Sequence, residues 1–519
     1  MNFADLFRAT LPETALEIAA LLVLVVDLGL LRKAALATRA AVAALLGVVG
    51  CGAAMETLLL QGNDGLSFQG SHELLLTTGG FTALAQTGIL VLTALTLMLL
   101  IDADFTRHVG EFVAVTLMSA AGGLLIAAAQ DLLVIFIGLE LLSLGLYILT
   151  AFAKSSGKSA EAALKYYLFG GMSAAFLLFG FSYLYGLSGS TSLPRVVLGT
   201  YMASAAGGAP LLYVALVMIA AGLGFKVASV PFHLWAPDTY EGAPAPAAAF
   251  IASVSKVASF ALLITISTVA LHFLESFHFT GGYVTFTSYP PGAPRPQITL
   301  GIPSTWPLIL MVLSTASMVV GNLAALAQTS VRRLLAYSAI AHAGYILLGL
   351  AYFSYSPRSA GAVLYYVLTY GLTTIGAFGV VAVVERATGS DRLDAFLGLH
   401  KRNPVLAAVL LVLFLSLAGI PPLVGFWAKF NLFAAVLGVQ ARGVPLVLVA
   451  GAVGMSAVSL YYYLQVLKRA YVMQAVDETA IQAPAITMIV LVGIAAAVVV
   501  LGCFPALLQG WIEGFYPAM

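Results

Sequence analysis

The sequence is built from long apolar segments separated by short polar connections. Fourteen segments of 17 or more mostly apolar residues recur from one end of the chain to the other. A transmembrane helix needs about 20 such residues to cross the roughly 30 Å hydrocarbon layer of a bilayer. The segments lack the strict alternation of apolar and polar residues that marks the strands of a membrane β-barrel. The pattern therefore predicts an all-α integral membrane protein with about 14 transmembrane helices.

The predicted spans, numbered along the chain, cover residues 15–31, 39–60, 79–101, 111–129, 131–152, 162–187, 211–230, 243–271, 306–325, 333–353, 361–384, 404–436, 445–467 and 486–507. The connection 272–305 contains Pro-Pro-Gly and no helical periodicity, which predicts an ordered cap or small hairpin outside the membrane. The predicted organisation is therefore three N-terminal helices (1–110), a repeat of helices 4–8 (111–271), the extramembrane loop (272–305), a repeat of helices 9–13 (306–467) and a C-terminal helix 14 (468–519).

Composition supports a membrane protein and excludes several other classes. Only 9% of the residues are charged and 61% are hydrophobic, and the mean hydropathy is +1.02. A soluble domain carries about 25% charged residues, so membrane lipid must solvate much of this surface. A net charge of +1 without a basic strip argues against nucleic-acid binding. Cys51 and Cys503 lie in separate apolar segments, so we expect no metal or iron–sulfur site in this chain.

The distribution of basic residues predicts the orientation of the chain in the membrane. Of the 23 Lys and Arg residues, 14 fall in connections that follow odd-numbered spans, five fall on the other side, and four lie inside spans. Cytoplasmic loops of membrane proteins are enriched in Lys and Arg. We therefore expect the odd-span connections in the cytoplasm and both termini on the opposite side of the membrane.

Two lysines inside spans lie beside predicted helix breaks. Lys226 precedes Pro231 by five residues, and Lys429 follows the pair Pro421 and Pro422. A charge at bilayer depth costs about 3 kcal/mol or more, whereas a proline-broken helix frees carbonyls that can hold an ammonium group or a proton-carrying water. Spans 7 and 12 cross the membrane in opposite directions, so the two breaks predict inverted repeats.

Two further charged residues lie in the middle of spans. Lys256, in span 8, is too deep to reach either membrane surface easily. Ser253 and Ser259 share its helical face, and their hydroxyls could carry water to the amine. Glu140, in span 5, has no basic residue within one turn. A pair between Glu140 and Lys226 would modulate whether the lysine keeps its proton; a purely structural ion pair is the alternative.

Three residues are candidates for a secondary proton path. Lys165 lies near the start of span 6, where snorkelling of its ammonium group to the membrane surface is a serious alternative. His233 comes just after Pro231, and His342 lies inside span 10. Histidines can shuttle protons near neutral pH, but a hydrogen-bonded structural role explains either residue equally well.

The most specific motif surrounds the first break. Residues 230–246 read Val-Pro-Phe-His-Leu-Trp-Ala-Pro-Asp-Thr-Tyr-Glu-Gly-Ala-Pro-Ala-Pro and resemble the break between spans 7 and 8 of the antiporter-like subunits of respiratory complex I. The Asp-x-Tyr-x-Gly-Ala-Pro portion is the form associated with subunit N. The M type usually carries Glu where Lys429 stands, and the L type adds a long C-terminal extension with a lateral helix. The resemblance covers nearly the whole chain.

The resemblance implies a non-redox, proton-translocating subunit of an NADH:quinone oxidoreductase. The implied relay consists of Glu140, Lys226, Lys256 and Lys429, with Lys165, His233 and His342 as a secondary path. The chain itself would bind no cofactor, because NADH, FMN, iron–sulfur clusters and quinone are expected in partner subunits. The expected partners are an M-type neighbour, small K-, J- and A-type subunits, and membrane lipid.

Two other functions fit parts of the pattern. Multi-subunit cation/proton antiporters and membrane-bound hydrogenases share the scaffold but usually lack the Asp-Thr-Tyr-Glu-Gly-Ala-Pro form. A stand-alone transporter of an organic solute usually adds convergent polar side chains and half-helix N-termini that point at its substrate. The intramembrane polar residues found here, a glutamate and lysines spread over several helices, do not match that pattern.

Overall fold

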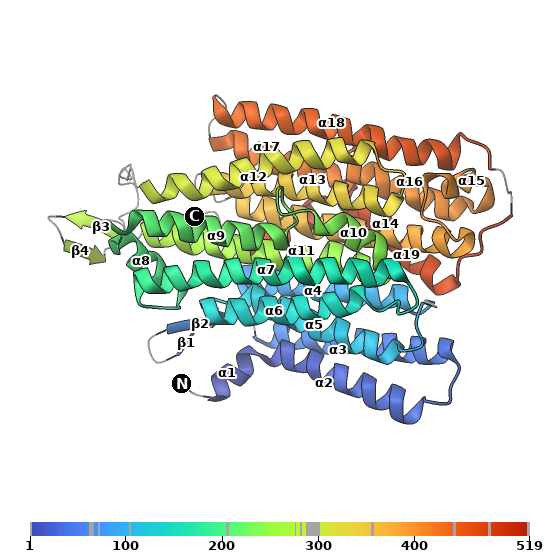
Figure 1. The fold of residues 1–519 in the computed structure, drawn as a ribbon, viewed down its shortest axis with the longest axis horizontal. Coiled ribbons are helices and arrows are strands. Elements are labelled where there is room, and N and C mark those ends of the chain that lie inside the picture. Colours follow the sequence, from blue (N-terminus) through green and yellow to red (C-terminus); the bar gives the residue numbers. More distant parts are fainter. Residues whose placement is uncertain are drawn as a thin grey trace.

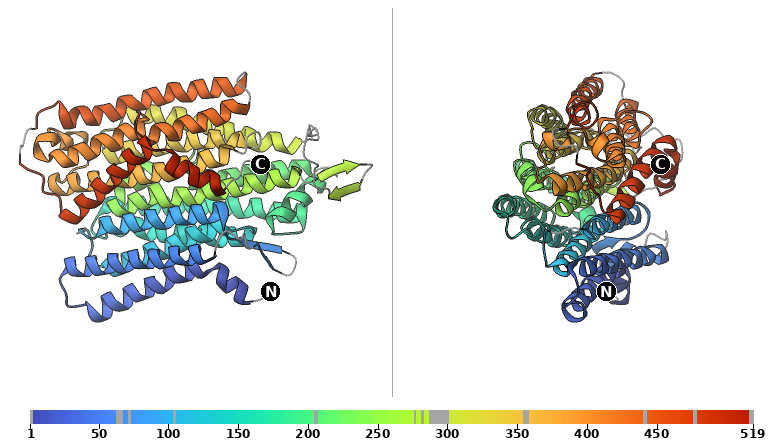
Figure 2. Two further views of the ribbon diagram at one scale, coloured as in Figure 1. Left: turned by 180° about the vertical axis from the view of Figure 1, so that it is seen from behind. Right: turned by 90° about the vertical axis from the view of Figure 1, so that its right-hand side faces the viewer.

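The long helices lie side by side with their axes along one direction, as the computed structural model shows (Figures 1 and 2). The structure describes residues 3–61, 67–70, 73–102, 105–203, 207–275, 277–280, 283–286, 301–353, 358–439, 443–475 and 479–515. Each predicted span corresponds to one helix or to two consecutive helical segments. The predicted all-α membrane fold, with inverted repeats and broken helices 7 and 12, is confirmed.

Helices α1, α2 and α3 lie at one side of the bundle, and α4 lies deeper within it (Figure 1). The N-terminal elements are α1 (Phe3–Ala9), α2 (Leu11–Val25), the π-helix Val26–Leu30, α3 (Leu36–Gln61), the strands β1 (Ser67–Gly70) and β2 (Glu73–Thr77), and α4 (Gly80–Leu100). The first span is α2 extended by the π-helix. Asp27 of this extension accepts two hydrogen bonds of 2.7 Å from the guanidinium of Arg39 in α3. This buried pair joins the first two spans.

The first repeat contains two more helices than its five spans require, namely the short α8 before span 7 and α10 after the break that ends span 7. Its elements are α5 (Val109–Ala128), α6 (Leu132–Thr150), α7 (Gly157–Ser188), the short α8 (Leu193–Ala203), α9 (Ala209–Lys226), α10 (Trp235–Gly242) and α11 (Ala245–Glu275). Asp131 separates α5 from α6 and caps α6 by accepting a hydrogen bond from the N–H of Leu133 (2.8 Å). Span 7 was predicted to run to residue 230, but α9 ends at Lys226, where the break begins.

The second repeat and the C-terminal helices complete the bundle. Their elements are α12 (Gly301–Leu326), α13 (Val331–Ala351), α14 (Arg358–Thr388), the 3-10 helix Leu393–Phe396, α15 (Leu399–Arg402), α16 (Pro404–Ala418), α17 (Val424–Val439), α18 (Val444–Tyr471), α19 (Ala485–Cys503) and α20 (Ala506–Phe515). Within the predicted loop 272–305, strands β3 (Phe277–Thr280) and β4 (Tyr283–Phe286) pair as an antiparallel hairpin. Residues 287–300 lie outside the described residues.

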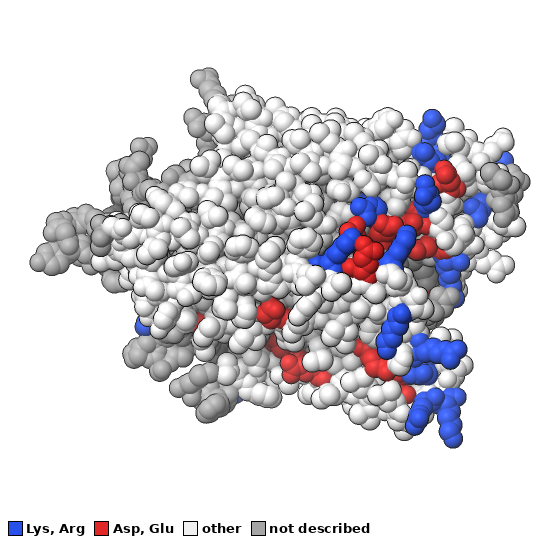
Figure 3. Space-filling view, viewed as in Figure 1, with Lys and Arg blue, Asp and Glu red and all other residues white. Residues whose placement is uncertain are grey.

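Two of the three innermost helices carry candidate residues, Lys256 in α11 and His342 in α13. α11, α13 and α14 are apolar and almost completely surrounded by protein, whereas α3, α18 and α19 are largely exposed on the outside. A helix that is apolar on all sides belongs to the centre of a bundle. Lys and Arg side chains gather towards one end of the molecule, and the long flank between the ends is largely uncharged (Figure 3). An apolar flank between polar ends fits a bilayer.

Close glycine contacts fix the position of α6, which carries Glu140. A Cβ atom added to Gly122 of α5 would lie 2.6 Å from the backbone nitrogen of Leu142 and 3.0 Å from the carbonyl oxygen of Gly138, both in α6. Small residues allow helix backbones to approach this closely in membrane proteins. The backbone atoms cannot move aside without shifting the whole helix.

We therefore predict that Gly122→Ala destabilises the protein by about 1–3 kcal/mol, the usual cost of forcing extra atoms into a packed interior. The measurement is the Tm of the detergent-purified protein. Gly171→Ala in α7 is the matched control, because a Cβ atom there meets nothing within 4 Å. Equal Tm values for the two variants would contradict the packing described here.

Candidate functional site

The first break separates α9 from α10 in span 7. α9 ends at Lys226, and α10 begins at Trp235. The indole Nε1 of Trp235 donates a hydrogen bond to the carbonyl of Phe225 (3.0 Å), and the backbone N–H of Val230 donates to Ser317 Oγ of α12 (2.9 Å). The break is therefore tied both to the end of its own helix and to the second repeat.

Lys226 is buried at this helix end, with 7% of its surface exposed. Its ammonium group donates a hydrogen bond to Ser143 Oγ of α6 and lies 3.9 Å from Glu140 Oε1 of the same helix. Glu140 and Ser143 are three residues apart and so share a face of α6. The structure thus brings Glu140 next to Lys226, while the hydrogen bond goes to a serine that the sequence did not single out.

Lys256 lies in α11 at the centre of the bundle and is 2% exposed. Its ammonium group donates to the carbonyl oxygen of Ala339 in α13 (2.5 Å) and lies 5.7 Å from the centre of the Tyr370 ring in α14. A carbonyl oxygen and an aromatic face both favour a nearby positive charge. Ser253 donates to its own helix, and the hydroxyl of Ser259 has no hydrogen-bond partner in the described part of the chain.

The second break separates α16 from α17 in span 12. Lys429 of α17 reaches back across it and donates to the carbonyl oxygens of Leu417 (3.1 Å) and Ala418 (2.9 Å), and to Ser456 Oγ of α18 (2.8 Å). The last carbonyls of a helix lack intrahelical partners and carry a partial negative charge. The broken end of α16 therefore forms a binding site for the ammonium group.

His342 of α13 is buried among tyrosine hydroxyls. Its Nδ1 lies 2.8 Å from the hydroxyl of Tyr366, and its Nε2 lies 3.4 Å from the hydroxyl of Tyr463. The Tyr463 hydroxyl is also hydrogen-bonded to Ser338. Both ring nitrogens thus have a partner that can donate or accept a proton, which is the arrangement a proton shuttle requires.

A series of aromatic rings connects Lys256 with Lys429 through His342. The Tyr370 ring, next to Lys256, lies 4.8 Å from the His342 ring. On the opposite side, the His342 ring lies 5.9 Å from the ring of Tyr345, and the ammonium group of Lys429 lies 5.4 Å from the centre of that same ring. The structure therefore places His342 between the two lysines.

Lys226 and His233 stand apart from the series of rings that links Lys256 with Lys429. Among the described residues, no hydrogen bond, ion pair or ring contact joins Lys226 directly to Lys256. His233 lies between α9 and α10 at the first break, where it is 9% exposed. The structure thus brings Glu140 to Lys226 and His342 to the other two lysines, and among the described residues no direct contact joins Lys226 to Lys256.

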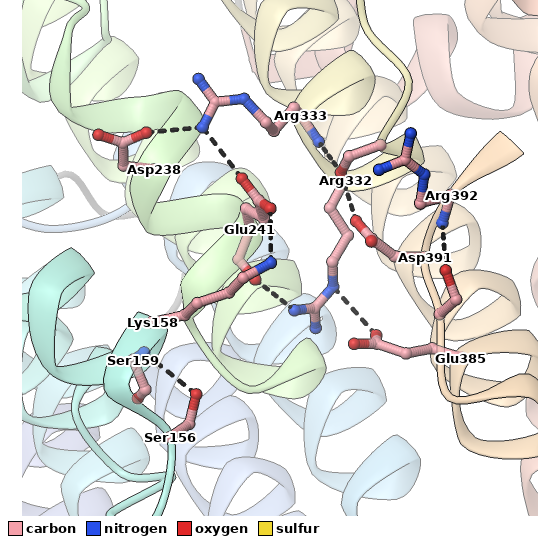
Figure 4. A network of polar contacts seen from close by, with 12 residues as sticks. Ser156, Lys158, Ser159, Asp238, Glu241, Arg332, Arg333, Glu385, Asp391 and Arg392 are labelled. Atoms are coloured by element: carbon pink, nitrogen blue, oxygen red, sulfur yellow. Dashed lines mark hydrogen bonds and ion pairs between the residues drawn. The ribbon is translucent and has the colours of Figure 1, made fainter.

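An ion-pair cluster, which sequence reasoning missed apart from Lys165, joins α10 to α7 and α13 (Figure 4). Arg333 of α13 lies 2.6 Å from Asp238 and 3.0 Å from Glu241, both in α10. Lys165 of α7 lies 2.7 Å from Asp238, and Lys158 lies 3.1 Å from Glu241. Lys165 thus lies in a partly exposed cluster of ion pairs rather than beside the buried amines.

The buried guanidinium of Arg332 completes the attachment of α10. It donates to the carbonyl oxygens of Glu241 (2.7 Å) and Ala243 (3.0 Å) at the end of α10, and it lies 3.2 Å from a carboxylate oxygen of Glu385 in α14. These carbonyls are helix-end acceptors that need a donor. α10, which follows the break of span 7, is thereby held by the first turn of α13, a helix of the other repeat.

The ion pairs lower the pKa values of both acids in α10. Burial raises the pKa of Asp238, but hydrogen bonds from Lys165 and Arg333 outweigh it and bring the pKa below its usual value. Burial likewise raises the pKa of Glu241, and hydrogen bonds from Arg333 and Lys158 bring it below its usual value. A carboxyl group whose pKa is lowered by folding stabilises the fold above its unfolded pKa and loses that effect as pH falls through the folded pKa.

We predict that Asp238→Asn lowers the Tm of the purified protein at neutral pH, because a carboxylate with two cationic partners contributes about 1–2 kcal/mol. The difference from wild type should shrink as the pH falls below about 4, where the wild-type carboxylate is itself protonated. Asp394→Asn is the control, since Asp394 is 79% exposed at its side chain. A Tm difference that stays the same at every pH would contradict this assignment.

Comparison with known proteins shows the family to which the chain belongs. A profile of the family described as NADH:quinone oxidoreductase/Mrp antiporter, TM, matches residues 129–287 and 297–456. "NADH-quinone oxidoreductase subunit N 2" of Acidobacterium capsulatum is 46% identical over 519 residues, which is 99% of each chain. "NADH-quinone oxidoreductase subunit N 1" of Roseiflexus castenholzii is 42% identical over 84% of this chain and 79% of its own length.

Solved structures share the fold. A chain of respiratory complex I from Thermus thermophilus with bound aureothin superposes with a TM-score of 0.74 at 31% identity, covering 96% of this chain and 98% of its own. A chain of the Mrp complex from Dietzia sp. has a TM-score of 0.76 at 21% identity over 97% and 98% of the two chains, and so shares the fold alone.

The chain therefore belongs to the NADH:quinone oxidoreductase/Mrp antiporter transmembrane family. Within that family, its curated relatives are subunits N of NADH-quinone oxidoreductases, as the Asp-Thr-Tyr-Glu-Gly-Ala-Pro motif predicted. Among the described residues, no group of three or more His, Cys, Asp or Glu side chains is placed to hold a metal ion.

Proposed function

We propose that the chain is the proton-translocating, antiporter-like subunit of a respiratory NADH:quinone oxidoreductase. The single observation that carries the proposal is the series from Lys256 through Tyr370, His342 and Tyr345 to Lys429, at the centre of a membrane bundle. Each ammonium group is removed from water, and each has only a few acceptors. Holding charged amines there is costly, and proton exchange is the natural reason to keep them.

In this proposal the proton moves from the first repeat to the second. Lys226 takes up a proton near the cytoplasmic break, Lys256 and then His342 pass it along the membrane, and Lys429 releases it towards the periplasm. Water must bridge Lys226 and Lys256, since no direct contact joins them among the described residues. Like charges in a poorly solvated interior repel each other, so protonation of one lysine favours release from the next.

Glu140 acts in this proposal as the group that biases Lys226. At 3.9 Å its carboxylate is close enough to favour the charged amine, but it is not the atom that accepts the amine's hydrogen bond. Any movement or protonation of Glu140 therefore changes the affinity of Lys226 for its proton without first breaking a hydrogen bond between them. Electron transfer in partner subunits could act on the relay through such a change.

The surroundings of the subunit follow from the same proposal. The end that carries most Lys and Arg would face the cytoplasm, with both termini in the periplasm of a bacterial inner membrane. An M-type neighbour and small K-, J- and A-type subunits would adjoin the chain, and NADH, FMN, iron–sulfur clusters and quinone would be bound by partner subunits. Lys165 and His233 would assist proton uptake beside the first break. The proposal includes the domain boundaries predicted from the sequence, which divide the chain into 1–110, 111–271, 272–305, 306–467 and 468–519.

We predict that Lys256→Met reduces proton pumping and coupled quinone reduction at least about tenfold, because the central carrier is lost. Both rates are measured on the assembled complex in proteoliposomes. Lys154→Met is the control, since Lys154 is exposed in the connection between α6 and α7. Wild-type pumping by a verified, fully assembled Lys256→Met complex would refute the proposed relay.

The main competing function is an autonomous cation/proton antiporter, which the shared fold of the Mrp complex chain favours. The two functions differ in what the isolated chain can do. We predict that vesicles containing this chain alone exchange neither Na⁺ nor K⁺ for protons, because no redox partner drives the relay. Cation flux above that of empty vesicles, lost in the Lys256→Met variant, would favour the antiporter instead.

A further inference from the structure

Ser143 is the residue that contacts the Lys226 ammonium group most directly. It is 2% exposed, and its oxygen accepts the hydrogen bond from Lys226. Its own hydroxyl hydrogen points to the carbonyl oxygen of Leu139, one turn earlier in α6 (2.5 Å). An ammonium group can only donate hydrogen bonds, so this orientation of the hydroxyl matches the charged form of the lysine.

The neutral form of the lysine requires the opposite arrangement. An amine that has lost its proton carries a lone pair, which is satisfied only by a donor. The Ser143 hydroxyl can rotate from Leu139 to Lys226 and supply that donor. Leu139 then still accepts the helical hydrogen bond from the backbone N–H of Ser143, so the rotation leaves no buried carbonyl without a partner.

The other two lysines have less adaptable partners. Lys256 donates to the carbonyl of Ala339, and two of the three acceptors of Lys429 are the carbonyls of Leu417 and Ala418. A carbonyl can only accept, so it stabilises the ammonium form and offers nothing to a lone pair. Lys429 also donates to a hydroxyl, that of Ser456, but shares it with these two carbonyls. At Lys226 the hydroxyl of Ser143 is the sole hydrogen-bond acceptor found among the described residues.

We propose that Ser143 is a reversible hydrogen-bond partner of Lys226, a hydroxyl that accepts from the ammonium group and rotates to donate to the amine. When Lys226 releases its proton, its N–H bond breaks and an O–H bond forms on the bridging water of the proposed relay. The serine keeps its own hydrogen throughout. The inference rests on the proposed relay function and adds to it the group that lets Lys226 exist in both protonation states.

The test is the pH profile of proton pumping by the assembled complex carrying Ser143→Ala. Hydrogen bonds to charged groups are roughly twice as strong as neutral ones, so losing the hydroxyl weakens the ammonium form more than the amine. We expect Lys226 to bind its proton about tenfold or more weakly, which shifts the alkaline limb of the profile to lower pH by about one unit. Ser143→Thr keeps the hydroxyl and should retain the wild-type profile.

Ser173→Ala is the matched control for the loss of a buried hydroxyl beside α9. Ser173 is buried in α7 and donates to the carbonyl of Gly222, one turn before Lys226, without touching the amine. The control should keep the wild-type pH profile. A wild-type profile in Ser143→Ala, or an equal loss in the Ala and Thr variants, would overturn the role of the hydroxyl.

These outcomes are distinguishable from a failure of the relay itself. If Lys256→Met still pumps protons, the proposed function fails, whatever Ser143→Ala does. If Lys256→Met abolishes pumping while Ser143→Ala is unchanged in rate and pH profile, the relay stands and only the inference about Ser143 is wrong.

Discussion

The structure depends on one constraint: a protonated amine in a membrane interior must find acceptors that water would otherwise supply. An intact helix offers only the second lone pair of a carbonyl that already accepts from its own helix, as Ala339 of α13 does to Lys256. The break in span 12 solves this by ending α16 in front of Lys429, so that two helix-end carbonyls face the ammonium group. At Lys226, acceptors come from another helix instead, a serine and a nearby carboxylate of α6.

Helix α13 contacts three separate parts of the molecule. Its first turn holds α10 through Arg332 and Arg333. Two turns later its backbone accepts the hydrogen bond of Lys256 at Ala339, and the next turn carries His342. A single rigid helix of the second repeat therefore contacts the broken helix of the first repeat, the central lysine and the path to Lys429. Movement of α10 would reach the central amines through this helix.

Much of this architecture could be predicted from the sequence, since the length and composition of the apolar segments are set by the bilayer itself. The breaks followed from Pro231 and the pair at 421–422, and the candidate amines followed from their depth. The structure adds α8 and α20, which have too few apolar residues to be recognised as spans. Glycine contacts such as that of Gly122 depend on which helices meet, and no periodicity contains that information.

The partners of the amines could not be predicted for a related reason. Ala339 takes part through its backbone carbonyl, which has no sequence signal, and the tyrosines around His342 are ordinary apolar-segment residues until the helices pack. The pair Asp238 and Arg333 joins residues 95 positions apart. Ser143 is the exception, because a hydroxyl one turn after the candidate Glu140 could have been chosen from helical spacing alone.

The most direct test of the account is a high-resolution density map of the assembled complex in a lipid bilayer. We expect Lys226, Lys256 and Lys429 to be shielded from lipid, with ordered water filling the interval between the first two and His342 between the last two. Lysine side chains that face lipid or bulk solvent, with no polar path between them, would contradict it.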